Sequence, residues 1–304
     1  MSQETVYLGR DGGPAGFELI ASGKVRDIYA AGSDHLLFVT SDRVSAFDVV
    51  MDAGIPQKGA VLTSIAAHWF ATTEHIVPNH LVHTDVDAIE GLDETWRERW
   101  RSRIMYVKRA KPDPVEWVVR GYIAGSGWKE YQKTQTVCGI SLPAGLELAQ
   151  QLPKPILTPT TKEEVHDRPL TPGEARDMVG AEHFEEAERV ALALFEHGTE
   201  TLKGLDIRLA DTKFEFGMRD GKLLLIDEAL TPDSSRFWAN EDYRVGISPP
   251  SFDKQILRDH LETLDWNKEA PAPALDPAVL QKVSDKYLEV CERITGSKPV
   301  EVSS

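Results

Sequence analysis

Residues 211–236, DTKFEFGMRDGKLLLIDEALTPDSSR, carry the strongest structural signal in the chain. Polar and apolar side chains alternate from Lys213 to Phe216, a pattern typical of a strand with one buried face. An apolar run at 223–226 predicts a second strand, joined to the first by a turn, and this run ends abruptly at Asp227-Glu228. The sequence therefore predicts a β-hairpin in which carboxylates interrupt a buried sheet.

The length of the turn decides which side chains share a face of this hairpin. If the turn holds an odd number of residues, such as Arg219-Asp220-Gly221, the pairing puts Lys213, Glu215 and Asp227 on one face. The other face then carries Phe214, Phe216, Leu224 and Ile226. An ammonium group beside two carboxylates suits a Mg²⁺–nucleotide site, because Mg²⁺ takes one or two protein carboxylates and completes its shell with water and phosphate oxygens. An exposed acidic hairpin is the alternative, but it does not explain why Asp227 follows an apolar run.

Composition excludes several classes of protein. The chain has 304 residues, 41% of them hydrophobic and 27% charged, which is enough for one large domain or two ordinary ones. The net charge of −15 argues against a nucleic-acid partner or an anionic membrane surface. Neither a signal peptide nor a membrane span is predicted, and Cys138 and Cys291 lack CxxC spacing. We therefore expect a cytoplasmic protein with reduced, buried cysteines.

The order of predicted elements gives an α+β fold with two domains. The Lys111-Pro112-Asp113-Pro114 segment interrupts regular structure and separates residues 1–112 from residues 113–304. The first domain is predicted to hold an antiparallel meander and a helix packed on it. Its elements are strands near 17–20, 25–29 and 36–40, a helix over 58–73, and strands near 80–84 and 103–109.

The second domain is predicted to mix strands and helices. Residues 138–170 lack periodicity and are interpreted as a long active-site loop. Asp276 and Pro277 are the expected N-cap and first residue of the last helix. The other elements are a strand at 115–121, a helix at 126–133, a helical region at 172–203, the hairpin, a helix from Pro249-Pro250 to 264, and the last helix to 294.

Two polar segments of the first domain are candidates for ligand binding. In Ser22-Gly23-Lys24-Val25-Arg26-Asp27, a glycine turn lets backbone N–H groups approach a polyphosphate while Lys24 and Arg26 supply positive charge. The Walker A spacing is absent, so an ordinary hairpin turn is the alternative. The loop TSDRVSAFD at 40–48, followed by Gln57-Lys58-Gly59, presents hydroxyl, arginine and carboxylate groups together, or is simply a solvated loop.

Two segments of the second domain complete the candidates. Arg120 ends an apolar strand, and Ser126 lies between two glycines where a new helix exposes free N–H groups, which suits a phosphate monoester. The polar run at 158–167 contains His166 beside Asp167. A lone histidine next to an aspartate more often has a hydrogen-bonding role than a catalytic one.

Six sequence blocks, in this order, resemble the SAICAR synthetase family. They are GKVRD at 23–27, SDRVSAFD at 41–48, EWVVRGYIAGSG at 116–127, EEVHD at 163–167, DTKFEFG at 211–217 and IDEALTPDSSRFW at 226–238. The resemblance implies an ATP-dependent ligase of de novo purine biosynthesis. Such an enzyme joins L-aspartate to the carboxylate of carboxyaminoimidazole ribonucleotide (CAIR) and releases SAICAR, ADP and phosphate, with Mg²⁺. It also implies a kinase-like or ATP-grasp-like N-terminal β domain beside a larger α/β domain with C-terminal helices.

The resemblance also implies roles for single residues. ATP would be bound by Gly23, Lys24 and Arg26 at the phosphates, by the backbone from Lys108 to Ala110 at adenine, and by Glu116 at the ribose. Mg²⁺ would be held by Glu215 and Asp227. The ribonucleotide phosphate would be bound by Arg120 and Ser126, and the imidazole and its carboxylate by Ser45, Asp48, Asp167, Lys213, Asp233 and Arg236. Asp211 would support these substrate-binding residues. Of these, Lys213, Asp48 and Asp167 would be catalytic, and Arg43 and Lys58 are assigned to the carboxylates of aspartate.

Two departures from shorter members of the family point to its longer form. Extra residues lie around 95–103, and the C-terminal extension begins near 265, so we expect a monomer. The rival functions are a small-molecule or lipid kinase and a nucleotide-binding regulatory module without turnover. Neither an H-R-D-x-x-x-x-N loop nor a D-F-G motif is present, although His166-Asp167-Arg168 superficially resembles the former.

Overall fold

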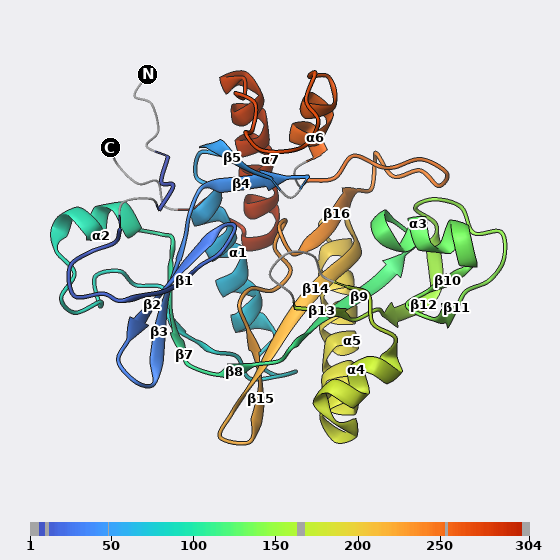
Figure 1. Cartoon of the computed structure of the whole chain (residues 1–304), viewed down its shortest axis with the longest axis horizontal. Helices are drawn as coiled ribbons and strands as arrows, with labels where there is room; N and C mark the ends of the chain where they lie inside the picture. The colour runs from blue at the N-terminus through green and yellow to red at the C-terminus, as the bar shows by residue number, and fades with distance from the viewer. Residues whose placement is uncertain (1–5, 10–11, 48, 163–167, 253–254, 300–304) are drawn as a thin grey trace. The chain divides into compact units, whose positions relative to one another are not determined.

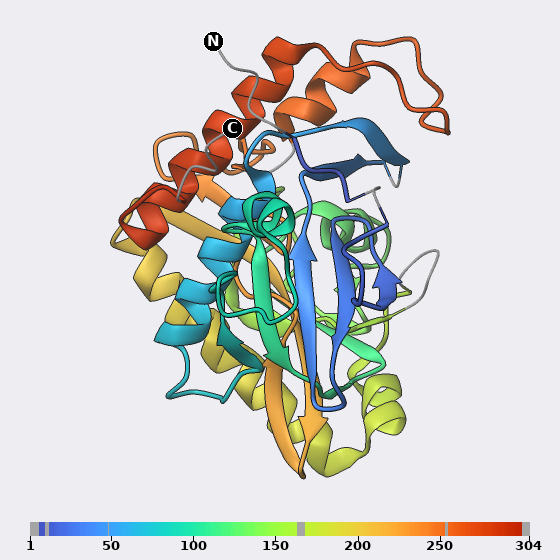
Figure 2. The same ribbon diagram turned by 90° about the vertical axis from the view of Figure 1, so that its left-hand side faces the viewer.

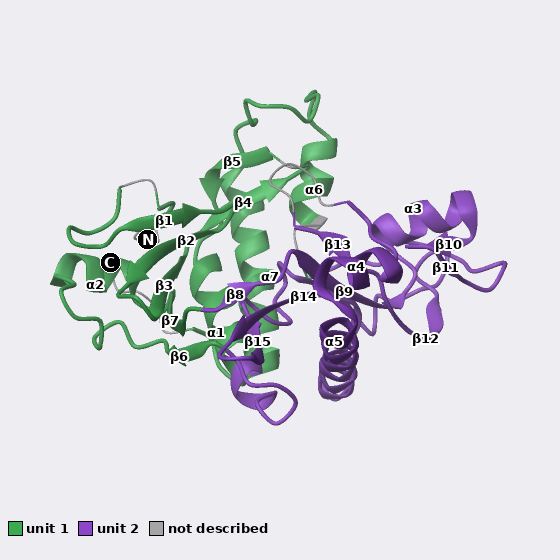
Figure 3. Cartoon of the chain, turned by 60° about the horizontal axis from the view of Figure 1, so that its bottom comes forward, with its two compact units in different colours: residues 1–68, 80–109, 252–304 green, residues 69–79, 110–251 purple. Residues whose placement is uncertain are grey.

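A computed structural model describes residues 6–9, 12–47, 49–162, 168–252 and 255–299. The chain forms two compact units, shown in different colours in Figure 3. Unit 1 comprises residues 1–68, 80–109 and 252–304, and unit 2 comprises residues 69–79 and 110–251. Unit 1 thus includes the C-terminal residues that the sequence analysis assigned to the second domain. The domain boundary at residue 112 stays a prediction.

Unit 1 is built on a five-stranded antiparallel sheet, visible in Figure 2. The strand order is β1 (Leu19–Ser22), β2 (Arg26–Ala31), β3 (His35–Thr40), β7 (Ile104–Lys108) and β6 (Leu81–His83). One face of the sheet packs around Trp100, which is fully buried with Tyr29 and Leu37. Trp100 ends α2 (Glu94–Trp100), and its indole N–H donates to the Tyr7 hydroxyl at 2.9 Å. The predicted meander is confirmed, and Trp100, from the segment near 95–103, supplies part of its core.

Helix α1 (Lys58–Thr72) confirms the helix predicted after the meander. Val61, Leu62, Ile65 and Trp69 are each at most 1% exposed, so the helix is buried on more than one side. Between β3 and α1, β4 (Arg43–Ala46) pairs with β5 (Val49–Gly54). The prediction of a loop throughout 40–48 was therefore wrong at residues 43–46, whose short run had too few alternating residues to indicate a strand.

Two C-terminal helices complete unit 1. They are α6 (Gln255–Glu262) and α7 (Pro277–Thr295). As predicted, Asp276 caps α7, its side chain accepting from the Ala278 N–H at 2.8 Å. The Ser284 hydroxyl donates to the Pro56 carbonyl at 2.8 Å, which ties α7 to the segment before α1. Pro249-Pro250 does not begin the preceding helix, because the chain is still extended at Ser251, which bridges to Trp238.

Unit 2 contains a seven-stranded sheet centred on β9 (Val115–Tyr122) and β14 (Ile207–Arg219). Helix α5 (Ala181–Lys203) packs on this sheet, as Figure 1 shows, and a Cβ added at Gly121 of β9 would lie only 2.7 Å from Phe195. The other strands are β12 (Gln151–Leu157), β13 (Thr160–Thr161), β15 (Lys222–Ile226), β16 (Ser235–Ala239) and β8 (Lys111–Pro112). The remaining elements are α3 (Gly125–Thr134), α4 (Pro172–Val179), β10 (Thr136–Val137) and β11 (Ile140–Ser141). The α+β fold class is confirmed.

Two predictions about unit 2 were wrong. Residues 138–170 are not one long loop, because β12 pairs with β9 at the edge of the sheet, where prolines at 153 and 155 are tolerated. Lys111-Pro112 does not interrupt regular structure but forms β8 against β14. The predicted helical region at 172–203 is confirmed. It consists of two helices, separated at Gly180, whose φ of 90° is accessible mainly to glycine.

The turn of the 211–236 hairpin also differs from the prediction. Arg219 pairs with Lys222, so the turn has two residues, Asp220 and Gly221, both with positive φ. This even-length turn places Ile226 opposite Glu215 in the ladder. The predicted sharing of faces, which required an odd-length turn, is therefore wrong, and the position of Asp227 needs another explanation.

Both cysteines are free and buried, as expected. Within the described ranges, no helix is long and apolar enough to cross a membrane.

Candidate functional site

Four charged side chains of unit 2 meet in the Lys213 cluster, which consists of Glu116, Lys162, Lys213 and Glu215. The Lys213 ammonium donates to Glu116 Oε1 at 2.7 Å and to Glu215 Oε1 at 2.8 Å. Lys162 Nζ bonds the other oxygen of Glu215. Glu116 Oε2 accepts from the Thr160 hydroxyl at 3.1 Å. Both carboxylates are therefore fully engaged by cations and hydroxyls.

Strand register explains why these charges meet. Phe214 of β14 pairs with Trp117 of β9, so the next position brings Glu215 opposite Glu116. Like charges directly opposite each other destabilise a sheet. Lys213, two residues before Glu215 on the same face, places an ammonium group between them. The alternation seen in the sequence therefore puts the Lys213 ammonium on the same face as the two buried carboxylates, where it offsets their repulsion.

Asp227 joins this group through its backbone conformation. Continued alternation after β15 would turn Asp227 to the face opposite Glu215. Asp227 instead adopts φ 64°, a left-handed conformation that interrupts the alternation. Its carboxylate lies close enough to Lys213 to affect the pKa of that ammonium group. The acidic residue is thus brought to Lys213 by a turn, not by the hairpin register.

The environment of Lys213 raises its pKa above the ordinary value. Burial alone would lower the pKa, but Glu215, Glu116 and Asp227 act in the opposite direction and prevail. The side chain keeps 29% of its surface exposed, which limits the effect of burial. Lys213 therefore remains an ammonium ion throughout the neutral range.

A second group in unit 2, the Asp211 cluster, contains Arg120, Ser126, Asp211 and Arg236. Arg120 donates to Asp211 at 3.0 Å and to the Ser126 hydroxyl at 3.1 Å, and Arg236 lies 3.3 Å from the same Asp211 oxygen. Gly125, which begins α3, has φ 56°, and a Cβ there would lie 2.6 Å from Arg236. The structure brings together four predicted residues, in which two arginines face one carboxylate.

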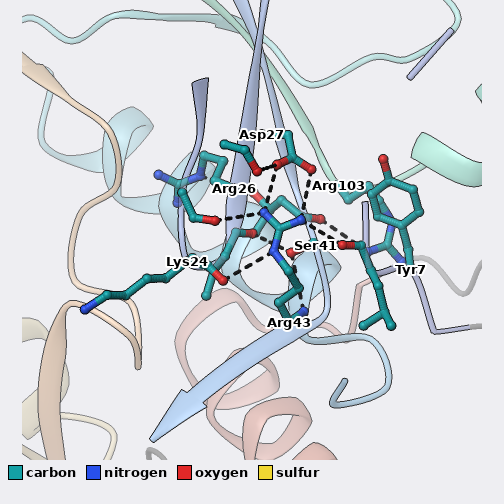
Figure 4. Close-up of polar contacts among 12 residues, drawn as sticks. Tyr7, Lys24, Arg26, Asp27, Ser41, Arg43 and Arg103 are labelled. Carbon is teal, nitrogen blue, oxygen red and sulfur yellow. Dashed lines mark hydrogen bonds and ion pairs between the residues drawn. The ribbon is translucent and has the colours of Figure 1, made fainter. Parts of the chain in front are cut away.

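In unit 1 the backbone carbonyls of the predicted glycine turn bond the Arg43 guanidinium, which Figure 4 shows between Asp27 and Lys24. The Arg43 guanidinium pairs with Asp27 at 2.8 and 3.1 Å and donates to the carbonyls of Gly23, Lys24 and Leu8 at 3.0, 3.3 and 2.7 Å. We call Arg43 with Asp27 the Arg43 clamp. Arg43 is 6% exposed and Asp27 1%. Their burial places Arg43 among the structural contacts of unit 1.

The other predicted residues lie on several elements. Lys24 is exposed and extends away from the clamp, whereas Arg26 is 7% exposed and bonds Thr40 at 3.4 Å. Lys58 is fully buried, with its ammonium 5.9 Å from the Tyr287 ring. Lys108 is exposed at the end of β7, and Ala110 lies two residues after it. Ser45 lies on β4, and Asp233 lies in the turn before β16. Asp48 and Asp167 lie outside the described residues.

The sequence did not predict three side chains that bond to residues of these two clusters. Thr158 accepts from Arg120 at 3.0 Å, Thr160 donates to Glu116, and Lys162 bonds Glu215. All three lie at alternate positions of one polar run, TPTTK at 158–162. Period-two spacing in a polar segment was the available signal, but without an apolar face it does not predict a strand.

Known proteins resemble this chain along most of its length. The SAICAR synthetase family matches residues 19–273. The phosphoribosylaminoimidazole-succinocarboxamide synthase of Syntrophotalea carbinolica is 54% identical over 284 residues, covering 93% of this chain and 96% of that protein. SAICAR synthase from Saccharomyces cerevisiae, solved with SAICAR, aligns with a TM-score of 0.85 at 39% identity and covers 93% and 96% of the two chains.

A third comparison concerns the nucleotide. A SAICAR synthetase structure in complex with ADP aligns with a TM-score of 0.67 at 25% identity, covering 92% of this chain and 98% of that one. The resemblance found from six sequence blocks is therefore confirmed, and the chain belongs to the SAICAR synthetase family of ATP-dependent ligases in purine biosynthesis.

Proposed function

We propose that the chain uses ATP and Mg²⁺ to join L-aspartate to CAIR through an acyl phosphate. A carboxylate is a poor acyl donor, because its leaving group would be oxide. Transfer of the γ-phosphoryl group to a carboxylate oxygen releases ADP and converts that leaving group to phosphate. The aspartate amine then attacks the carbonyl carbon, expels phosphate and loses a proton to form the amide. The observation that carries this proposal is the Lys213 cluster, which concentrates carboxylates and ammonium groups on one sheet face.

The residues present fit a divalent cation. Glu215 and Asp227 both act on Lys213, and one or two carboxylates suffice for Mg²⁺ when phosphate and water complete its shell. Across the described part of the chain, no group of three or more histidine, cysteine or acidic side chains has the arrangement of a protein-only metal site. Glu215 and Asp227 would hold the ion, replacing the bond from Lys162 to Glu215. When bound, Mg²⁺ would supply positive charge to the phosphates.

Lys213 acts in this proposal as a fixed charge. Its ammonium group is held by Glu116, which the proposal leaves off the metal, so we assign Lys213 the role of a cation and not that of proton acceptor for the aspartate amine. An ammonium held between two carboxylates is already oriented before the substrates bind. It therefore stabilises negative charge that develops on the transferring phosphoryl group without further rearrangement. The amine's proton acceptor is assigned to Asp48, Asp167 or phosphate itself.

The Asp211 cluster is assigned to the phosphate of the ribonucleotide. Two guanidinium groups and one carboxylate leave an excess of positive charge, which suits a phosphate monoester. Asp211 holds Arg120 and Arg236 in place and limits their freedom before binding. The first turn of α3 adds backbone N–H groups beside Ser126.

The test is aspartate- and CAIR-dependent release of ADP and free phosphate by the whole chain. All dependencies should appear together, with one phosphate released per ADP. A kinase would form ADP but leave the phosphate on its substrate, and a regulatory module would bind ATP without aspartate-dependent turnover. We further propose that the enzyme is cytoplasmic and acts as a monomer. Sedimentation of the purified chain would check the monomeric state.

A further inference from the structure

The Arg43 guanidinium has no donor left for a ligand. It carries five N–H groups, and five acceptors within unit 1 receive them: both oxygens of Asp27 and the carbonyls of Leu8, Gly23 and Lys24 (Figure 4). The chain also closes over the pair at Gly9, where an added Cβ would lie 2.7 Å from Arg43 Nη1. Binding an aspartate carboxylate would require breaking these bonds and leaving Asp27 buried without its cation.

The bonds fix the orientation of three successive peptide groups. The Arg43 guanidinium donates hydrogen bonds to the carbonyls of Gly23 and Lys24. Ser41 donates to the carbonyl of Val25 from both its hydroxyl and its backbone N–H, each at 2.8 Å. In a trans peptide the carbonyl of one residue and the N–H of the next point in opposite directions. The N–H groups of Lys24 and Val25 are therefore directed away from the clamp. Successive N–H groups turned to one side form an anion-binding concavity.

We propose that Arg43 is a positioning residue for the nucleotide phosphates, not a ligand of aspartate. This inference rests on the proposed function, in which the turn at 23–26 meets ATP. Arg43 and Ser41 hold the turn's carbonyls inward, so that its N–H groups are oriented for the phosphates before ATP arrives. Asp27 fixes the guanidinium in that orientation, and its Oδ1 also accepts from the Ser22 hydroxyl at 2.5 Å. The motifs at 22–27 and 41–43 thus form one phosphate-binding device.

The proposal is tested by substituting Arg43→Lys in the whole chain, with Arg103→Lys as the matched control. Lysine keeps the charge but cannot reproduce five donors in a planar fork. Arg103 is equally buried in unit 1 and pairs with Asp42 at 3.0 Å, but it bonds Thr40 instead of the turn. Ser41→Ala is a milder variant. It removes the hydroxyl bond to the Val25 carbonyl and the 3.4 Å bond from the Arg43 N–H to that hydroxyl, but it leaves the ion pair with Asp27 intact.

The measurements are the Kd for ADP by calorimetric titration, the KM values for ATP and aspartate, and thermal unfolding. For Arg43→Lys we expect the Kd for ADP and the KM for ATP to rise about tenfold, with the KM for aspartate within about twofold of the parent. For Ser41→Ala we expect a rise in the Kd for ADP of about threefold. Arg103→Lys should lower the unfolding temperature comparably but leave the Kd for ADP within about twofold.

Three results would overturn the inference. If Arg43→Lys raised the KM for aspartate and left the Kd for ADP unchanged, Arg43 would be a ligand of aspartate. Equal losses of ADP affinity in Arg43→Lys and Arg103→Lys would show only a general structural effect. Unchanged ADP affinity in both Arg43→Lys and Ser41→Ala would show that the turn does not depend on the clamp. Failure of the proposed function is separate, because the parent chain itself would then lack aspartate-dependent ADP release.

Discussion

The Arg43 clamp and the Lys213 cluster are both ionic groups held among strands, yet they use their charges differently. In the clamp, one cation and one anion are nearly completely buried, and every guanidinium donor bonds an acceptor of the same unit. In the cluster with Asp227, three carboxylates face two ammonium groups, and one of these, Lys162, has 42% of its side chain exposed. The first arrangement is complete by itself, whereas the second keeps an excess of negative charge and an exchangeable cation.

This difference distinguishes a group that supports the backbone, the Arg43 clamp, from a group that can bind ligands, the Lys213 cluster. A closed set of bonds fixes the backbone but offers nothing to a ligand. A group with more carboxylates than cations lowers the stability of the fold unless a further cation joins it. The Lys213 cluster can therefore bind a cation. Burial and charge balance, taken together, distinguish residues that position a site from residues that touch its ligands.

The largest expected effect tests the open cluster at Asp227. Asp227→Asn should reduce kcat at least about a thousandfold, because it removes one of the two carboxylates assigned to Mg²⁺. Asparagine tolerates left-handed backbone, so the φ of 64° is preserved and the fold should remain intact. ADP release and the unfolding temperature would be measured together. Asp220→Asn, an exposed residue of the hairpin turn with a similar φ, is the control and should leave both unchanged. Full activity in Asp227→Asn would remove the metal assignment.

The next effect concerns stability and contrasts the two cations. Arg43→Met leaves the Asp27 carboxylate buried and unpaired, which should lower the free energy of unfolding by about 3–5 kcal/mol. Lys162→Met removes a partly exposed cation and should cost less than about 1 kcal/mol. Calorimetric unfolding would show the difference.

The double variant Arg43→Met with Asp27→Asn supplies the control for this contrast. It should recover part of the loss, because the unpaired charge is gone while the missing hydrogen bonds to Gly23 and Lys24 are not restored. Equal losses in Arg43→Met and Lys162→Met would contradict the distinction between a closed and an open group.

Local sequence predicted the elements that depend on periodicity and caps. Alternation identified the first hairpin strand, the helical spacing of apolar residues identified α1, and Asp276-Pro277 marked the start of α7. The resemblance also named Arg120 and Asp211 among the substrate residues, and the register of β9 and β14 places them opposite each other.

Features that depend on distant partners could not be predicted in this way. The acceptors of Arg43 lie 16 to 35 residues away, on segments whose approach is set by the whole sheet. The face occupied by Asp227 depended on a turn length that differs by a single residue and on one backbone dihedral. The prolines of β12 concealed a strand that exists because the edge of a sheet tolerates them.

A smaller effect concerns exchange at Glu215. If Lys162 competes with the divalent cation, Lys162→Met should bind Mn²⁺ about two- to tenfold more tightly in the absence of nucleotide, because Glu215 no longer has to release an ammonium group. Electron paramagnetic resonance of free Mn²⁺ gives the dissociation constant. Lys154→Met, at an exposed position on β12, is the control and should bind like the parent. Weaker Mn²⁺ binding in Lys162→Met would show that Lys162 supports the ion site instead of competing for it.

The smallest expected effect concerns pH: the charge of Lys213 should stay constant over the neutral range. The pKa of Lys213 is raised, so the stabilisation from its contacts is fully present below the ordinary lysine value and is lost only as pH rises through the folded-state pKa. Between pH 6 and 9 its charge does not change. The pH profile of kcat should therefore keep its shape in Lys213→Arg, even where the rate falls, because arginine is also permanently charged. A limb of the parent's profile that disappears in Lys213→Arg would identify Lys213 as a proton acceptor and place it among the titrating groups of the reaction.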